Sequence, residues 1–187
     1  MNIYALQTVK AQDGLPSDDN TLIISAVEGV HGHRPLWLIN LMQAYKCERI
    51  KKTFCSTDHP LIKEAILSTV ICGESLYNFE DAIDRPENLQ GEGELHEETV
   101  KHGLSEIEER TGETVDILIV LLGNSHSARQ KDINNVLDEL TSNSEEEISN
   151  NEFKVFNESF WMSKRKHIIA EDWPQSFLEE EAVINGN

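Results

Sequence analysis

This sequence contains no long apolar run. Its longest uninterrupted stretch of aliphatic residues, Ile117 to Leu122, is far shorter than the roughly 20 residues that a helix needs to cross a bilayer. The N-terminal residues also lack the basic start and apolar core of a secretory signal. We therefore expect a soluble, cytoplasmic protein that has no membrane partner.

Basic residues are also scarce. Only 16 Lys and Arg stand against 34 Asp and Glu, so the formal net charge is -18, and Ser163 to His167 is the one densely basic stretch of the sequence. A protein of this charge repels a nucleic-acid backbone unless one of its faces is sharply basic, and we expect no nucleic-acid partner. The acidic residues gather in clusters that are typical of solvated helix faces or loops: Glu92 to Glu98, Glu106 to Arg110, Ser144 to Ser149 and Leu178 to Ala182.

Cysteines are few, and repeats and linkers are missing. Cys47, Cys55 and Cys72 are an odd number without metal-ligand spacing, which predicts free thiols in a reducing compartment. No repeat or Pro/Gly-rich hinge divides the 187 residues. Because turn-forming residues fill positions 11–20, we expect a flexible N-terminal arm over 1–20 and a single domain over 21–187.

The hydrophobic pattern alternates between strands and helices. Such an order predicts an α/β fold with a mainly parallel sheet and right-handed crossovers, in which the run of 116–122 is a central strand. Pro60 fits the first turn of a helix and Gly112 fits a helix stop. The expected strands are 21–27, 52–57 and 116–122, and the expected helices are 36–45, 60–68, 95–112 and 131–140.

Three expected loops follow the carboxyl ends of these strands, where open parallel sheets bind ligands. They are 28–35, 57–59 and 123–129, and together they carry His31, His33, His59 and His126. One interpretation is a metal site built from imidazoles. The other is a set of loop histidines that form local hydrogen bonds or line a polar pocket.

Four short motifs follow one another along the chain. They are Ser56, Thr57 and Asp58 in CSTDHPLIKEA; Arg85, Pro86, Leu89 and His102 in RPENLQGEGELHEETVKHGL; Asp116, Arg129, Asp132 and Ile133 in DILIVLLGNSHSARQKDI; and Gln175, Asn185 and Gly186 in PQSFLEEEAVINGN. In this order and spacing the chain resembles the acylneuraminate (CMP-sialic acid synthetase type) cytidylyltransferases, in a divergent and C-terminally shortened form.

This resemblance implies a Rossmann-like, three-layer nucleotide-diphospho-sugar transferase fold. It also implies transfer of CMP from CTP to an acidic sugar of the sialic-acid type, with Mg2+ as cofactor and release of pyrophosphate. The site that it implies comprises Arg129 and Arg34 as catalytic residues; Ala26, Glu28, Gly29, His31, Gly32, Arg85, Gly123 and Asn124 at the nucleotide; Ser125, His126 and Gln175 at the sugar; and Asp58 and Glu92 at the metal.

The chain also departs from the family pattern. Val27 stands where the family has an arginine, and Glu28 adds a negative charge to a loop that should hold a triphosphate. The family's pair of magnesium-binding aspartates has no counterpart in this sequence. A second interpretation is therefore a catalytically inactive nucleotidyltransferase fold that serves as a binding or interaction module. A third is self-assembly, at least into a homodimer, through the aromatic and basic stretch of 156–173.

Overall fold

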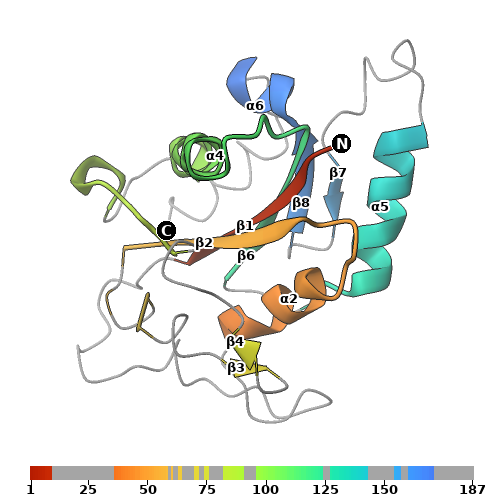
Figure 1. The fold of residues 1–187 in the computed structure, drawn as a ribbon, viewed down its shortest axis with the longest axis horizontal. Coiled ribbons are helices and arrows are strands. Elements are labelled where there is room, and N and C mark those ends of the chain that lie inside the picture. Colours follow the sequence, from red (N-terminus) through yellow and green to blue (C-terminus); the bar gives the residue numbers. More distant parts are fainter. Residues whose placement is uncertain are drawn as a thin grey trace, which may run out of the picture.

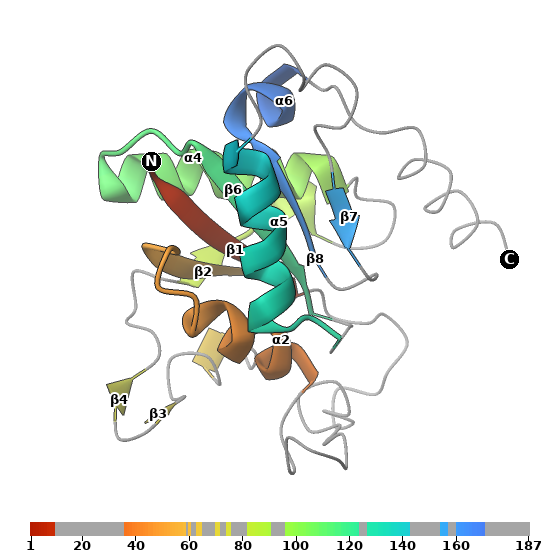
Figure 2. The same ribbon diagram turned by 90° about the vertical axis from the view of Figure 1, so that its right-hand side faces the viewer.

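The computed structural model of the chain describes residues 1–9, 36–58, 60, 63–64, 70–71, 74–75, 82–90, 96–123, 127–142, 154–156 and 160–170. These residues form three layers, with α2 (Leu36–Tyr45) and α5 (Gln130–Ser142) on one face of a sheet and α4 (His96–Thr111) and α6 (Arg165–Ala170) on the other (Figures 1 and 2). The expected α/β class with a mainly parallel sheet is confirmed. The described helices are too short or too polar to cross a membrane.

The main sheet has six strands in the order β5-β2-β1-β6-β8-β7. Their bounds are β1 Ile3–Val9, β2 Lys52–Thr57, β5 Ala82–Asp84, β6 Ile117–Leu122, β7 Lys154–Phe156 and β8 Phe160–Lys164. The first four of these strands are parallel to one another, and β8 is antiparallel to both β6 and β7. A short antiparallel pair, β3 (Val70–Ile71) and β4 (Glu74–Ser75), and the 3-10 helix η2 (Glu87–Leu89) complete the described elements.

The N-terminal residues correct the expectation of a flexible arm. Ile3–Val9 is a strand that is buried along its whole length, and it lies between β2 and β6. The backbone N–H of Asn2 donates to Asp116 Oδ2 at 2.6 Å, and its side chain donates to the Thr114 carbonyl at 2.8 Å. The prediction of a flexible arm is therefore wrong for residues 1–9, because Ile3–Val9 is an apolar and β-branched run that precedes the turn-forming residues. Residues 10–35, with the expected strand of 21–27, lie outside the described part.

Most other predicted elements are confirmed. The helix of 36–45 and the strand of 52–57 match α2 and β2 residue for residue, and the predicted strand of 116–122 matches β6 apart from its first residue. The predicted helices of 95–112 and 131–140 correspond to α4 and α5. Of the predicted helix of 60–68, the structure describes Pro60, Lys63 and Glu64, all of which are helical.

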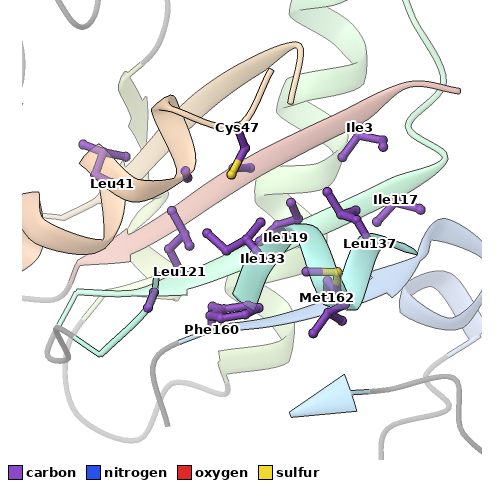
Figure 3. Packing of buried hydrophobic residues seen from close by; sticks show 14 of the residues in the cluster. Ile3, Leu41, Cys47, Ile117, Ile119, Leu121, Ile133, Leu137, Phe160 and Met162 are labelled. Atoms are coloured by element: carbon purple, nitrogen blue, oxygen red, sulfur yellow. The ribbon is translucent and has the colours of Figure 1, made fainter. Parts of the chain in front are cut away.

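Two hydrophobic cores flank the sheet because successive strand residues point to opposite faces. Ile117, Ile119 and Leu121 of β6 pack with α2 and α5 (Figure 3), whereas Leu118 and Val120 pack with α4 and α6. Every one of these side chains is at most 1% exposed. β6 is thus buried on both faces, as its unbroken apolar sequence predicts.

A glycine with positive φ ends α4. Gly112 has φ 67°, and its N–H donates to the Glu108 carbonyl at 2.9 Å, which closes the last turn of the helix. A Cβ at this position would meet no atom within 4 Å. The requirement for glycine is therefore set by the backbone alone.

We expect Gly112→Ala to lower the free energy of unfolding by about 1 kcal/mol, because an L-alanine is strained in the left-handed region. Gly112→Asn should cost less, since asparagine adopts this conformation more readily. Urea unfolding of the three proteins measures the difference. Equal losses in both variants would contradict a purely conformational requirement.

Candidate functional site

The carboxyl ends of four parallel strands meet at one edge of the sheet. Val9 is in register with Thr57, Thr57 with Asp84, and Thr8 with Leu122. After β1, β2 and β6 the chain leads into helical residues, so the segments that leave this edge alternate with helices. This is where ligands bind in open sheets of this architecture.

Arg85 connects three of these strand ends. It follows β5 directly and only 6% of the residue is exposed. Its Nε donates to Ser56 Oγ at 3.1 Å, and its Nη2 donates to the carbonyls of Ser56 and Val9, each at 3.2 Å. A buried guanidinium with several geometrically fixed donors holds backbone carbonyls in place. Arg85 therefore fixes the points at which the segments after β1 and β2 begin.

Gly123 brings the end of β6 against the end of β1. Its N–H donates to the Thr8 carbonyl at 3.1 Å. A Cβ here would lie 2.9 Å from that carbonyl oxygen and 2.9 Å from Val9 Cγ2. Because such distances are too short for a real contact, only glycine allows this approach. Gly123 and Arg85 thus bind the last two carbonyls of β1.

Arg129 is the last residue before α5. The residue is exposed, and its Nη1 donates to the Ala128 carbonyl at 3.0 Å. Its own carbonyl accepts from the N–H groups of Asp132 and Ile133 at 3.0 and 3.1 Å, so it stands at the start of α5. Arg129 therefore directly precedes α5, and its predicted binding of phosphate or carboxylate stays a prediction.

The start of α4 contributes two buried ionisable groups that the motif comparison did not single out. His96 packs edge-on against Trp161, with ring centroids 6.3 Å apart, and its Nε2 is buried. Burial, and secondarily the charge of Arg85, lower the pKa of His96 from 6.5 to about 4. The imidazole is therefore neutral over most of the physiological range.

Glu97 is the second of these groups. It is 5% exposed, and within the described part of the chain neither of its carboxyl oxygens has a hydrogen-bond partner. Val100, Leu104 and Ile107 continue the same buried stripe of α4. A glutamate at the first position of an apolar stripe is the sequence signal that could have identified it.

The two described cysteines do not supply a nucleophile. Burial raises the pKa of Cys47 to about 11, against a smaller opposing effect of the Arg49 charge. Burial likewise raises the pKa of Cys55 to about 12, with Arg85 opposing. Both thiols are buried, free and protonated at neutral pH.

The metal ligands predicted from the sequence are only partly placed. Asp58 directly follows β2, whereas Glu92 lies outside the described residues. Asp84 at the end of β5 is bound to Lys63, with 2.7 Å between Oδ2 and Nζ. Among the described residues no three His, Cys, Asp or Glu side chains gather into a metal site. Because Glu92 lies outside the described part, the magnesium site that the resemblance implies stays a prediction.

The structure describes three of the other predicted site residues, and the rest lie outside the described part. Arg85 and Gly123 are brought together at the end of β1, while Arg129 stands apart at the start of α5. The remaining residues lie outside the described part: Ala26, Glu28, Gly29, His31, Gly32, Arg34, Asn124, Ser125, His126 and Gln175. His33 and His59 also lie outside it, so the histidine metal site stays a prediction.

The low pKa of His96 predicts a pH-dependent stability. Because the folded-state pKa lies below the unfolded value of 6.5, the unfolded chain binds more protons between pH 6.5 and about 4. Wild-type protein should lose stability as the pH falls through this window, by up to about 3 kcal/mol from this group. His96→Phe, which keeps a ring against Trp161, should lack that part of the loss. Parallel urea-unfolding profiles of the two proteins would contradict the prediction.

We expect Glu97→Met to stabilise the protein by about 1–2 kcal/mol, because a buried carboxylate without hydrogen bonds costs more than its favourable position near a helix N-terminus returns. Glu98→Met is the matched control. Glu98 occupies the same turn but is exposed, with its Oε1 3.0 Å from Lys101 Nζ. Thermal unfolding measures both variants, and a lower melting temperature for Glu97→Met than for the control would contradict the prediction.

Solved structures of known proteins share this architecture. No protein-family model matches the sequence, and no curated protein matches it either. Among solved structures, a CMP:2-keto-3-deoxy-manno-octonic acid synthetase complexed with CTP superposes with a TM-score of 0.59 at 13% identity, over 99% of this chain and 86% of that one. A cytidylyltransferase from Leptospira borgpetersenii also gives 0.59 at 13% identity, over 92% of this chain and 64% of its own length.

A third similar structure is 4-diphosphocytidyl-2C-methyl-D-erythritol synthase from Anaerococcus prevotii, with a TM-score of 0.55 at 13% identity, over 95% of this chain and 75% of that one. At such identities the similarity concerns the arrangement of the chain. It agrees with the order of the parallel strands and with the helices on both faces. The chain has the nucleotide-diphospho-sugar transferase fold that these cytidylyltransferases share.

Proposed function

We propose that this protein is a cytidylyltransferase that transfers CMP from CTP to an acidic sugar of the sialic-acid type. In this reaction a sugar hydroxyl loses its proton and its oxygen attacks the α-phosphorus of CTP. The bond from the α-phosphorus to the bridging oxygen breaks, and pyrophosphate leaves. Chemistry of this kind depends on positioning and charge neutralisation more than on a covalent intermediate.

The observation that carries the proposal is the set of hydrogen bonds that fixes the strand ends at the carboxyl edge of the sheet. Arg85 and Gly123 hold the last two carbonyls of β1, so the segments after β1, β2 and β6 leave from one fixed place. In this fold a solved relative is complexed with CTP, and the sequence motifs resemble an acidic-sugar cytidylyltransferase. The fold, the position of the edge and the motifs support the same class of reaction.

The proposed roles follow the chemistry of the side chains. Arg129 and Arg34 would neutralise phosphate or the sugar carboxylate, since guanidinium groups bind both anions in a bidentate manner. The backbone N–H groups of 28–33 would bind phosphate oxygens. Arg85 donates to Ser56 and to the Val9 carbonyl within the protein, and we propose that it acts at the nucleotide by holding these strand ends in place.

Magnesium enters the proposal through the resemblance, with Asp58 and Glu92 as its candidate ligands. Nucleotide-bound magnesium commonly uses one or two carboxylates together with water. Of these two carboxylates, Asp58 directly follows β2 and Glu92 lies outside the described residues. Assembly into a homodimer is likewise part of the proposal, and sedimentation at high protein concentration tests it.

A second candidate function is an inactive member of the same fold that acts as a binding or interaction module. Two observations favour it: the acidic Glu28 in the first predicted phosphate loop, and the lack of a carboxylate cluster among the described residues. Measured pyrophosphate release with CTP and nine-carbon sugar acids distinguishes the two candidates. CTP binding without any release would favour the binding module.

The proposed function predicts micromolar, magnesium-dependent binding of CTP, with weaker binding of ATP and GTP, in calorimetric titrations. Arg129→Ala should lower turnover roughly 100-fold, because one charge-stabilising group of a phosphoryl-transfer site is commonly worth about that much. Arg49→Ala is the matched control, since this arginine pairs with Asp138 at 2.6 Å on the C-terminal part of α5. Full activity of Arg129→Ala would show that Arg129 is not part of the site.

A further inference from the structure

Asn40 is a fully buried polar residue in α2, at 0% exposure. Its Nδ2 donates to the carbonyl of Leu122 at 3.1 Å, and its Oδ1 accepts from the N–H of Ala128 at 3.2 Å. Leu122 is the last residue of β6, and Ala128 comes shortly before α5. One carboxamide therefore bridges the entrance and the exit of the β6–α5 connection.

Further contacts from α2 and the residues that follow it hold the start of α5. Gln43 Oε1 accepts from the N–H of Gln130 at 3.3 Å, and the Gln130 side chain donates to the Lys46 carbonyl at 2.7 Å. The Cys47 thiol lies 3.8 Å from the Gln130 carbonyl. Asn40 and Gln43 share one face of α2, whereas Lys46 and Cys47 follow the end of the helix. The shared face forms a polar stripe within an otherwise apolar helix.

The stripe is not what packing alone would select. The neighbours of Asn40 in α2 include Leu38, Ile39 and Leu41, all of them buried in the apolar core. A leucine at position 40 would fit such a helix without any need for hydrogen-bond partners. The hydrogen bonds that Asn40 forms with Leu122 and Ala128 instead fix the distance between the Leu122 carbonyl and the Ala128 N–H.

The distance between the Leu122 carbonyl and the Ala128 N–H determines the positions of the residues that follow them, Gly123 and Arg129. Gly123 directly follows Leu122 and must reach the Thr8 carbonyl, while Arg129 directly follows Ala128. Displacement of Ala128 by even 1 Å would move Arg129 relative to the end of β1, and such shifts are costly in sites that work by positioning.

We propose that Asn40 is a positioning residue of the site: its carboxamide sets the separation between Leu122 and Ala128 and thereby places Arg129 for the phosphate or carboxylate of the ligand. This inference rests on the proposed function for the identity of the ligand. The hydrogen bonds that support it involve only protein groups. Its structural part can therefore be tested without any nucleotide.

The first experiment is amide hydrogen exchange of the wild-type protein. Ala128 lies outside any helix or strand, yet the Asn40 bond should protect its N–H to a degree comparable with the amides of β6. In Asn40→Leu we expect exchange at Ala128 to rise at least tenfold while the amides of β1 stay protected. An Ala128 amide that is unprotected in the wild type overturns the proposal whether or not any variant folds.

The second experiment measures ligand affinity and turnover with CTP. Asn40→Leu should lower kcat/KM at least tenfold, with little change in the urea-unfolding midpoint. Asn40→Asp still accepts from Ala128 but cannot donate to Leu122, so it should restore part of the Ala128 protection and part of the activity. Thr53→Val, which removes a buried hydroxyl from β2, is the control. It should change neither the exchange at Ala128 nor kcat/KM.

The outcomes separate the two claims. If the wild type binds no nucleotide, the proposed function is wrong, and Asn40 loses its role toward the ligand even where the exchange data confirm its hold on Ala128. If the wild type turns over CTP and Asn40→Leu matches it in both exchange and kcat/KM, the positioning proposal is overturned while the function stands.

Discussion

The structure depends on the burial of β1 between two parallel neighbours. Both edges of this strand are hydrogen-bonded, to β2 on one side and β6 on the other, and both of its faces are covered by helices. A parallel strand in this position must be apolar on both faces, which Ile3–Val9 nearly is. Gln7 and Thr8 are the polar exceptions, and both lie near the carboxyl end of the strand. The helices pack where they do because β1 and β6 present two apolar faces.

The same end of β1 concentrates the polar interactions of the interior. Its last two carbonyls accept from Gly123 and Arg85, which follow β6 and β5, strands on opposite sides of β1 in the sheet order. Asn40 then ties the end of β6 to the start of α5. Buried polar groups are tolerated when they are hydrogen-bonded, and such networks define one geometry among several apolar packings. The protein thus uses its buried polar groups mainly at the edge where the proposed ligand binds.

The start of α4 shows the other side of this balance. The neutral His96 and the carboxylate of Glu97 are buried at the same edge of the sheet, in a helix that otherwise packs through Val100, Leu104 and Ile107. Ionisable groups that are buried at a cost gather at functional sites more often than in ordinary cores. The charge of Arg85 acts on His96, so this helix start is electrostatically linked to the end of β5, which the sequence motifs did not indicate.

Local patterns allowed most elements to be predicted. Helical periodicity identified α4 and α5, an unbroken aliphatic run identified β6, and Gly112 was recognised as a helix stop. The prediction of a flexible arm was wrong for residues 1–9. The short strand stands before a long turn-forming stretch, and its neighbours in the sheet lie far away in the sequence, at Lys52–Thr57 and Ile117–Leu122.

The sequence by itself determined the α/β class and the alternation of strands and helices, because both follow from residues that are close together along the chain. The tertiary structure alone decided that Ile3–Val9 is a central strand, that the Arg85 guanidinium binds the ends of β1 and β2, and that Asn40 bridges Leu122 and Ala128. These relations join residues that are dozens of positions apart. Their partners are chosen by the packing of the sheet, which no local pattern encodes.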